Sequence, residues 1–214
     1  MTCFITFEGI EGCGKTTQLQ LLAHRLEGRG HLVTITREPG GCPIADQIRS
    51  ILLDAENRSI VPLAELFLYA AARAQHVSEV VAPALEAGRI VLCDRFTDAT
   101  IAYQGYGREL DLSVISQLNS LATAGIGPHL TLLLDCPAET GLSRAMSRIE
   151  STTGAREERF EQESLLFHKR VRDGYLELAR KEPKRFVTID AAAGISETGE
   201  AIAAAVFERF AFSG

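Results

Sequence analysis

The sequence lacks the features of membrane, repeat and fibrous proteins. No apolar run reaches the length of a bilayer span, and no basic and apolar leader region opens the chain. No internal repeat and no low-complexity linker interrupts its 214 residues. We therefore expect one globular domain without a membrane partner.

Cysteine is scarce and is not spaced for disulfides or metal. The five cysteines are widely separated, their number is odd, and no C-x-x-C motif occurs. Cys3, Cys93 and Cys136 adjoin apolar runs, where a thiol is usually a small buried hydrophobe. Cys13 lies in a glycine-rich loop and could make that loop sensitive to thiol reagents. The pattern predicts a reducing, cytoplasmic location.

Positive charge is also in deficit. The formal net charge is −6, which argues against nucleic acid as the main partner because its phosphate backbone attracts basic surfaces. A phosphorylated small molecule remains compatible with this charge, because a cleft can concentrate local positive charge. The 46% hydrophobic and 23% charged residues are ordinary for a globular protein.

A phosphate-binding loop stands near the start of the chain. It fits G-x-x-x-x-G-K-[ST] and lies between an apolar strand at 3–7 and a helical pattern at 17–26. Its glycines allow backbone N–H groups to surround phosphate, the lysine adds a full charge, and the threonine offers a hydroxyl to Mg²⁺. The predicted ATP-binding residues are Gly9, Ile10, Glu11, Gly12, Cys13, Gly14, Lys15, Thr16 and Thr17. The alternative is a glycine-rich turn that happens to precede a helix.

Further strands alternate with helical patterns along the chain. The strands are expected at 32–36, 90–94, 130–135 and 186–190, and helices at 44–53, 62–87 and 201–210. Pro83 should kink the long helix or divide it. This alternation predicts an α/β fold, with a five-stranded parallel sheet covered by helices on both faces.

Two aspartates follow predicted strands, at the edge where such sheets bind ligands. Asp94 is followed by Arg95, which predicts a metal-organising carboxylate beside a phosphate-binding guanidinium. The alternative for Asp94 is a helix N-cap, and for Asp135 the N-cap is the favoured interpretation.

The segment 147–163 is polar and contains several arginines. It is either a solvated surface loop or a lid that brings arginines to a transferring phosphate. The sequence has no N-K-x-D stretch of the kind that reads guanine in GTPases.

Several motifs together resemble the bacterial thymidylate kinases. They are the loop with its preceding Phe7-Glu8, then Arg37-Glu38-Pro39-Gly40-Gly41, Ala72-Arg73-Ala74-Gln75, Asp94-Arg95, Ala102-Tyr103-Gln104-Gly105, Asp135, Arg159-Phe160-Glu161 and Ile189-Asp190. The resemblance spans the chain in order. It implies a P-loop kinase fold of one domain, 1–214, with an arginine-bearing lid at about 144–160. It also implies transfer of the γ-phosphoryl group of ATP to dTMP with Mg²⁺, and a homodimer.

The resemblance also implies site residues. The catalytic residues would be Lys15, Asp94, Arg95, Arg148 and Arg156; the dTMP-binding residues Glu38, Arg49, Tyr69, Arg73, Arg95, Thr100, Tyr103 and Gln104; and the metal ligands Thr16 and Asp94. Tyr69 stands where the family usually has a phenylalanine stacked on thymine, and stacking tolerates this change. The alternative for Tyr69 is an ordinary core aromatic.

The phosphate loop carries no positive charge in its variable positions, unlike that of some family members. Because the transition state still needs neutralising charge, we expect lid arginines to supply it, first Arg148 and Arg156 and then Arg144. Two alternatives remain: a kinase for another nucleoside monophosphate or a deoxynucleoside, and a nucleotide-binding switch without catalysis. The Asp94-Arg95 pair argues against the switch, which needs no grip on an acceptor phosphate.

Overall fold

The computed structural model describes residues 2–150 and 159–210. Its centre is a parallel sheet in the order β2-β3-β1-β4-β5. The strands are β1 (Cys3–Glu8), β2 (Val33–Arg37), β3 (Ile90–Asp94), β4 (Leu130–Asp135) and β5 (Phe186–Asp190). The predicted sheet is confirmed, and every predicted strand lies within one residue of its expected bounds. Every residue of β1 is buried, as expected for a parallel strand covered on both faces.

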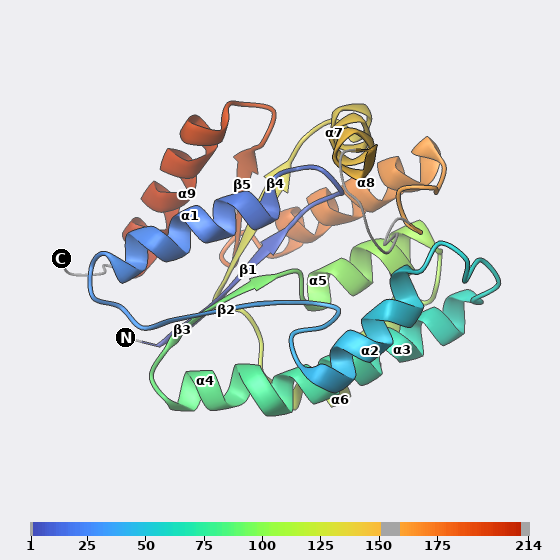
Figure 1. Ribbon diagram of the computed structural model, residues 1–214, viewed down its shortest axis with the longest axis horizontal. Coiled ribbons are helices and arrows are strands. Elements are labelled where there is room, and N and C mark those ends of the chain that lie inside the picture. The colour runs from blue at the N-terminus through green and yellow to red at the C-terminus, as the bar shows by residue number, and fades with distance from the viewer. Residues whose placement is uncertain (1, 151–158, 211–214) are drawn as a thin grey trace.

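Helices cover both faces of this sheet (Figure 1). They are α1 (Lys15–Glu27), α2 (Pro43–Leu53), α3 (Pro62–His76), α4 (Ala82–Glu86), α5 (Thr97–Thr100), α6 (Leu112–Thr123), α7 (Ala138–Glu150), α8 (Leu165–Lys181) and α9 (Ile195–Phe210). Alternate residues of β1 divide between two apolar clusters, because successive strand residues point to opposite faces. Figure 1 shows α1 and α9 on one side of the sheet and α4 and α6 on the other.

Two π-helical segments interrupt the regular helices, η1 (Val77–Val81) and η2 (Ile101–Gly107). The helix expected at 62–87 is therefore α3, η1 and α4 in succession, and the backbone stays helical at both junctions. Pro83 lies in the first turn of α4, where the backbone N–H that proline lacks is least needed as a hydrogen-bond donor. The π turn, rather than a sharp break, divides the helix.

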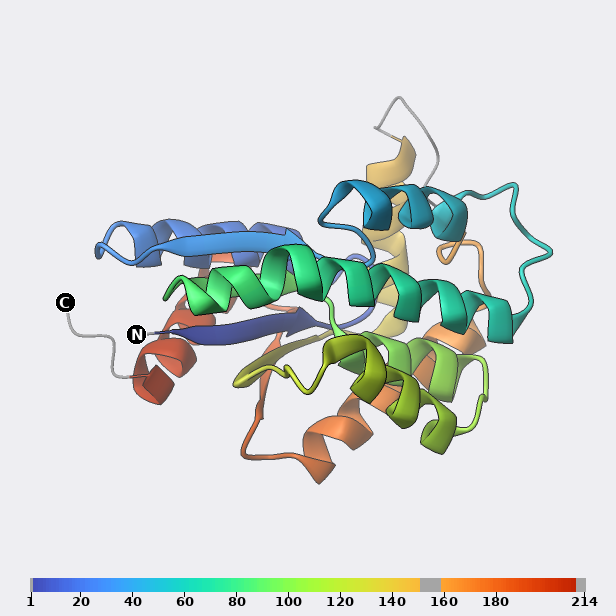
Figure 2. The same cartoon turned by 90° about the horizontal axis from the view of Figure 1, so that it is seen from below.

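The strand ends define the functional edge of the molecule. The register pairs Phe7 with Asp94 and Asp94 with Arg37, so the ends of the three strands β1, β3 and β2 lie level. Figures 1 and 2 show that α2 and α7 both extend beyond the end at which the strands finish. Among the described residues, no helix is both long and apolar enough to cross a bilayer.

Candidate active site

A cleft of about 1060 Å³ lies at this edge of the sheet. Most of the predicted site residues line it: Glu11, Gly12, Lys15, Thr16, Glu38, Arg49, Tyr69, Arg73, Asp94, Arg95, Thr100, Tyr103 and Gln104. The remaining predicted loop residues, Gly9, Ile10, Cys13, Gly14 and Thr17, are not among its lining residues. One cleft therefore collects residues from five separate segments of the chain.

The phosphate loop curves around the start of α1. Gly9 has φ 136° and Gly14 φ 94°, a region that side-chain-bearing residues rarely adopt. A Cβ on Gly9 would stand 2.4 Å from the carbonyl oxygen of Leu134, so only glycine fits there. The Lys15 ammonium donates to the carbonyl oxygens of Gly9 at 3.1 Å and Ile10 at 2.8 Å. The loop thus holds a cation beside its own backbone, where phosphate oxygens could replace those carbonyl acceptors.

Two oxygen ligands meet beside the loop. The Thr16 hydroxyl donates to Asp94 Oδ2 at 2.7 Å, although the two residues are 78 apart in the chain. A hydroxyl and one carboxylate fit Mg²⁺, which is usually bound by one or two carboxylates together with substrate phosphates and water. Among the described residues, no group of three acidic, histidine or cysteine side chains could hold a metal alone. Asp94 is not a helix cap, because α5 begins at Thr97 with Phe96 as its N-cap.

Arg95 is fixed at the rear of the cleft. Its guanidinium donates to the Gly9 carbonyl at 3.0 Å, to the Tyr175 hydroxyl at 3.2 Å and to Glu11 Oε1 at 3.1 Å. It also lies over the Tyr103 ring, 4.7 Å from the centroid. The backbone has φ 70°, a strained conformation that surrounding contacts must maintain. Arg95 is thus an oriented cation facing the same cleft as Lys15.

Glu11 organises several groups around this cation. The Tyr103 hydroxyl donates to its carboxylate, and His168 Nδ1 lies 3.2 Å from Oε2. Burial opposes ionisation of Glu11, but His168, Arg95 and Lys15 outweigh it and lower its pKa to about 2. Glu11 is therefore an anion at neutral pH.

Arg73 is almost completely committed to protein partners. It donates to Glu38 at 2.7 Å, and the other acceptors are Asn119 Oδ1, the Phe96 carbonyl and Thr100 Oγ1. A guanidinium has five N–H groups, so these bonds leave one for a ligand. Arg73 is therefore held rigidly in the cleft wall and keeps one N–H that no described partner uses.

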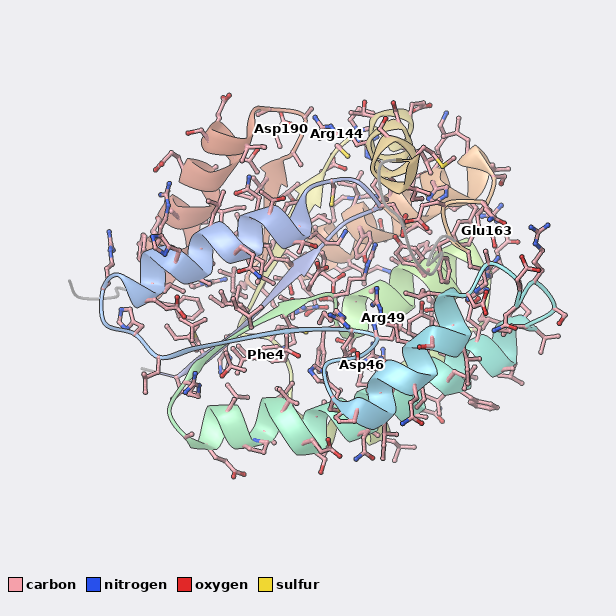
Figure 3. All side chains as sticks on the ribbon, viewed as in Figure 1. Phe4, Asp46, Arg49, Arg144, Glu163 and Asp190 are labelled. Carbon is pink, nitrogen blue, oxygen red and sulfur yellow. The ribbon has the colours of Figure 1, made fainter. Side chains whose placement is uncertain are left out.

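The loop after β2 forms another wall. Arg49 Nη1 donates to the Pro39 carbonyl at 2.9 Å, while Asp46 accepts from Arg37 and from the Gly41 N–H. Figure 3 shows Arg49 and Asp46 on the same helix, α2, beside this loop. Glu38 was expected to help place the phosphate with Arg49. Its carboxylate is buried against Arg73 and His76, and these two contacts hold it in the cleft wall.

Aromatic rings surround the far end of the cleft. Tyr69 is half-buried, and its ring centroid is 6.5 Å from that of Phe160; the Tyr103 and Phe160 rings meet edge to face at 5.5 Å. Because Tyr69 lines the cleft, it is more than a core aromatic. An aromatic ring that lines a cleft, as Tyr69 does, can stack on a planar base.

Two of the three predicted lid arginines cannot be placed relative to the cleft. Arg156 lies outside the described residues, and so does the side chain of Arg148. Arg144, the third candidate, donates to the Ala191 carbonyl at 2.9 Å, and Figure 3 shows it near Asp190.

The expectation for Asp135 is wrong. Asp135 does not cap a helix, because α7 begins three residues later. Arg172 instead donates to both oxygens of its carboxylate, at 2.7 and 2.8 Å.

A buried carboxyl that the site prediction did not include stands behind the cleft. Glu8 is fully buried, and it accepts from the Tyr175 hydroxyl and the Phe96 N–H, both at 2.7 Å. Burial and the neighbouring Asp98 carboxylate raise the pKa of Glu8 to about 8, although Tyr175 and Arg95 oppose the shift. The same tyrosine hydroxyl contacts Arg95, so Glu8 belongs to the support of that cation.

This shift predicts a pH-dependent stability. A folded-state pKa of about 8 lies above the unfolded value of roughly 4.3. The stabilising contribution of Glu8 is therefore complete below the lower value and is lost as the pH rises through the higher one. Between these values, wild-type unfolding free energy should fall relative to Glu8→Gln by up to about 1.4 kcal/mol per pH unit. Denaturant unfolding of both proteins across this range measures the difference, and parallel curves would contradict it.

Other site residues gave no signal in the sequence. His168 and Tyr175 come from α8, more than 150 residues after the phosphate loop, and Asn119 comes from α6. Each occupies an unremarkable position in an amphipathic helix. Only the packing of these helices against η2 and α3 brings them to the site.

Comparison with known proteins agrees with this geometry. The thymidylate kinase family profile matches residues 7–202. The chain is 67% identical over 211 residues to the thymidylate kinase of Geotalea uraniireducens (99% of each chain), and 61% identical over 209 residues to that of Geobacter sulfurreducens (98% of each chain). It is similar to the crystal structure of Ehrlichia chaffeensis thymidylate kinase, with 34% identity and a TM-score of 0.76, over 96% of this chain and 98% of that one. The chain therefore belongs to the thymidylate kinase family.

Proposed function

We propose that the cleft binds ATP at the phosphate loop and dTMP between α2, α3 and η2, and that the γ-phosphoryl group passes between them to give dTDP and ADP. Phosphorylation of dTMP by ATP is the reaction of the family, and the chain is a dTMP kinase. One observation supports the assignment of residues to the two phosphates. Lys15 and Arg95 line a single cleft and both donate to the Gly9 carbonyl oxygen, so a cation for a donor phosphate lies beside a cation for an acceptor phosphate.

Each residue then has a chemical role. Lys15 and the loop amides hold the ATP phosphates, and Arg95 holds the dTMP phosphate with Arg49 nearby. Thr16 and Asp94 hold Mg²⁺, which neutralises charge on the phosphate oxygens when bound. The base lies against Tyr69, where the remaining Arg73 donor reaches a thymine carbonyl, and Thr100, Tyr103 and Gln104 complete the pocket.

The test is ADP production from MgATP with dTMP, dUMP, CMP and thymidine as acceptors. We expect fast turnover with dTMP and weak turnover with CMP and thymidine. Discrimination against dUMP depends on one methyl group, worth about 1–3 kcal/mol in an apolar pocket. Fast turnover with CMP would remove the thymine pocket but leave the phosphate-loop assignment. ATP binding without turnover would favour a switch protein.

Neutralising the two leading lid arginines should reduce the chemical step. In the double variant Arg148→Met/Arg156→Met, we expect kcat to fall by about 10²-fold or more, with little change in the KM for dTMP. The reason is that the phosphate loop carries no cation in its variable positions. Steady-state kinetics measure both constants. Arg180→Met, at an exposed ion pair on α8, is the matched control, and an unchanged kcat in the double variant would reject the lid assignment.

We further propose that the chain forms a homodimer through α3 and α6. These helices contact each other and leave large apolar side chains in solvent: Leu63 (48% exposed), Phe67 (51%), Val114 (41%) and Leu121 (79%). Large apolar side chains exposed on two contacting helices are typical of an interface, and a two-fold axis would bury the same surface on both copies.

Replacing Phe67 and Leu121 by glutamate should shift the protein to monomer, because buried charges would oppose association. We expect a dissociation constant at least about 100-fold weaker, measured by sedimentation. Leu32→Glu, at a position near the start of β2 whose exposure (62%) lies between those of Phe67 and Leu121, should remain dimeric. A monomeric wild type would contradict the proposal. A cytoplasmic location and a single-domain organisation of 1–214 are also proposed, and the five free, buried cysteines support the former.

A further inference from the structure

Glu65 is a buried carboxylate behind the wall of the cleft. It lies on α3, is 0% exposed and does not line the cleft itself. Two guanidinium groups neutralise it, with Arg159 Nη2 at 2.7 Å from Oε2 and Arg108 at 3.3 Å from each oxygen. Burying a charge this deeply is costly unless the charge is fully paired. We therefore ask what this carboxylate does for the residues that line the cleft.

Gln104 is the side chain between Glu65 and the cleft. It lies on η2, is 1% exposed and lines the cleft, and its Nε2 donates to Glu65 Oε1 at 2.8 Å. A glutamine side-chain amide can usually be rotated by about 180°, which exchanges its oxygen and nitrogen with little change in shape. Here it cannot, since a carboxylate held by two guanidinium groups can only accept hydrogen bonds. The amide nitrogen must face Glu65, and no described residue donates to the amide oxygen.

The consequence is a fixed hydrogen-bonding pattern at the cleft. Gln104 can present only an acceptor there, and Arg73, which lines the same cleft, has one N–H donor left. Thymine and uracil carry an N3–H donor beside the O4 acceptor, and they match this pair. Cytosine carries an unprotonated N3 beside an amino group, so both of its groups would meet a partner of the same kind.

We propose that Glu65 is a positioning residue for base selection, which holds the Gln104 amide so that cytosine nucleotides are refused. The proposal rests on the proposed function, because it requires the base to lie against Gln104. Arg159, whose Nη2 lies 2.7 Å from Oε2, is the guanidinium closest to this carboxylate.

The decisive variant is Glu65→Gln. A glutamine at position 65 can donate as well as accept, so both orientations of the Gln104 amide find a partner. We expect the ratio of kcat/KM for dTMP to that for dCMP to fall by about 10-fold or more. This ratio separates positioning from general loosening, because a weakened fold would slow both substrates together.

Arg108→Met is the matched control. It removes one partner of Glu65 but keeps the carboxylate, Arg159 and the bond to Gln104, so its dTMP to dCMP ratio should stay at the wild-type value. If Glu65→Gln does not fold, Glu65→Gln/Arg108→Met removes one charge of each sign and is compared with Arg108→Met alone. Thermal unfolding identifies which variant is folded.

Each outcome has one interpretation. A lower ratio in the folded Glu65 variant, with the control unchanged, supports the proposal. An unchanged ratio overturns it while the wild-type dTMP kinase activity stands, and an equal loss in Arg108→Met overturns it in favour of a purely structural role. A wild type without dTMP turnover would overturn the proposed function together with this inference.

Discussion

Replacing Lys15 by methionine should lower kcat by about 10²–10³-fold. Lys15 is 7% exposed, and its ammonium already lies within the phosphate loop, bonded to the carbonyl oxygens of Gly9 and Ile10. Phosphoryl transfer requires little covalent chemistry from the protein, so its rate depends on position and on neutralising charge. Methionine retains most of the side-chain length and removes only the cation.

The measurement is kcat at saturating MgATP and dTMP. Lys169→Met is the matched control, because Lys169 is an exposed lysine that pairs with Glu139 and does not line the cleft. The control should behave as the wild type does. A Lys15 variant within a few-fold of wild type would mean that the transition-state charge is neutralised elsewhere.

Replacing Arg95 by methionine should lower kcat/KM for dTMP by about 10²–10³-fold, and leave the KM for ATP little changed. The guanidinium is held by the Gly9 carbonyl, Glu11 and Tyr175, so its orientation is set before the substrate arrives. Such preorganisation is what makes a charge effective in catalysis. The φ of 70° penalises methionine and arginine alike, so the backbone does not confound the comparison.

Loss of this cation also leaves Glu11 with fewer partners in a buried site. Some destabilisation should therefore accompany the kinetic effect, and thermal unfolding measures it separately. Arg95→Lys keeps the charge but loses the forked geometry, and we expect an intermediate kcat/KM. If methionine and lysine variants bind dTMP as wild type does, Arg95 does not hold the acceptor phosphate.

Both predictions concern residues that line the cleft and that contiguous sequence motifs identify. The phosphate loop, the Arg37–Gly41 loop and the Asp94-Arg95 pair are contiguous motifs at strand ends. Parallel strands bring their carboxyl ends to one edge whatever the details of packing, so the motifs had to meet there. For the same reason, the lining of the cleft by Lys15, Thr16 and Asp94 could be expected.

The residues that hold these cleft-lining side chains in place could not be predicted from sequence motifs. Glu65 contacts Arg159 and Gln104, and His168 contacts Glu11, because segments far apart in the chain pack together. No local pattern marks such partners, since an acid or a histidine on an amphipathic helix looks the same whether it faces water or a buried arginine. Asp135 is the clearest case. Its position in the sequence favours a helix cap, but Arg172 on α8 donates to both of its carboxylate oxygens.

The sequence by itself therefore determined the sheet, the phosphate loop and the family, because strand periodicity and contiguous motifs are local properties of the chain. Only the tertiary structure decided how Arg95 is held, why Glu38 turns toward Arg73, and which way the Gln104 amide faces. Those outcomes depend on hydrogen bonds between groups 35 to 86 residues apart, whose geometry exists only after the chain has packed.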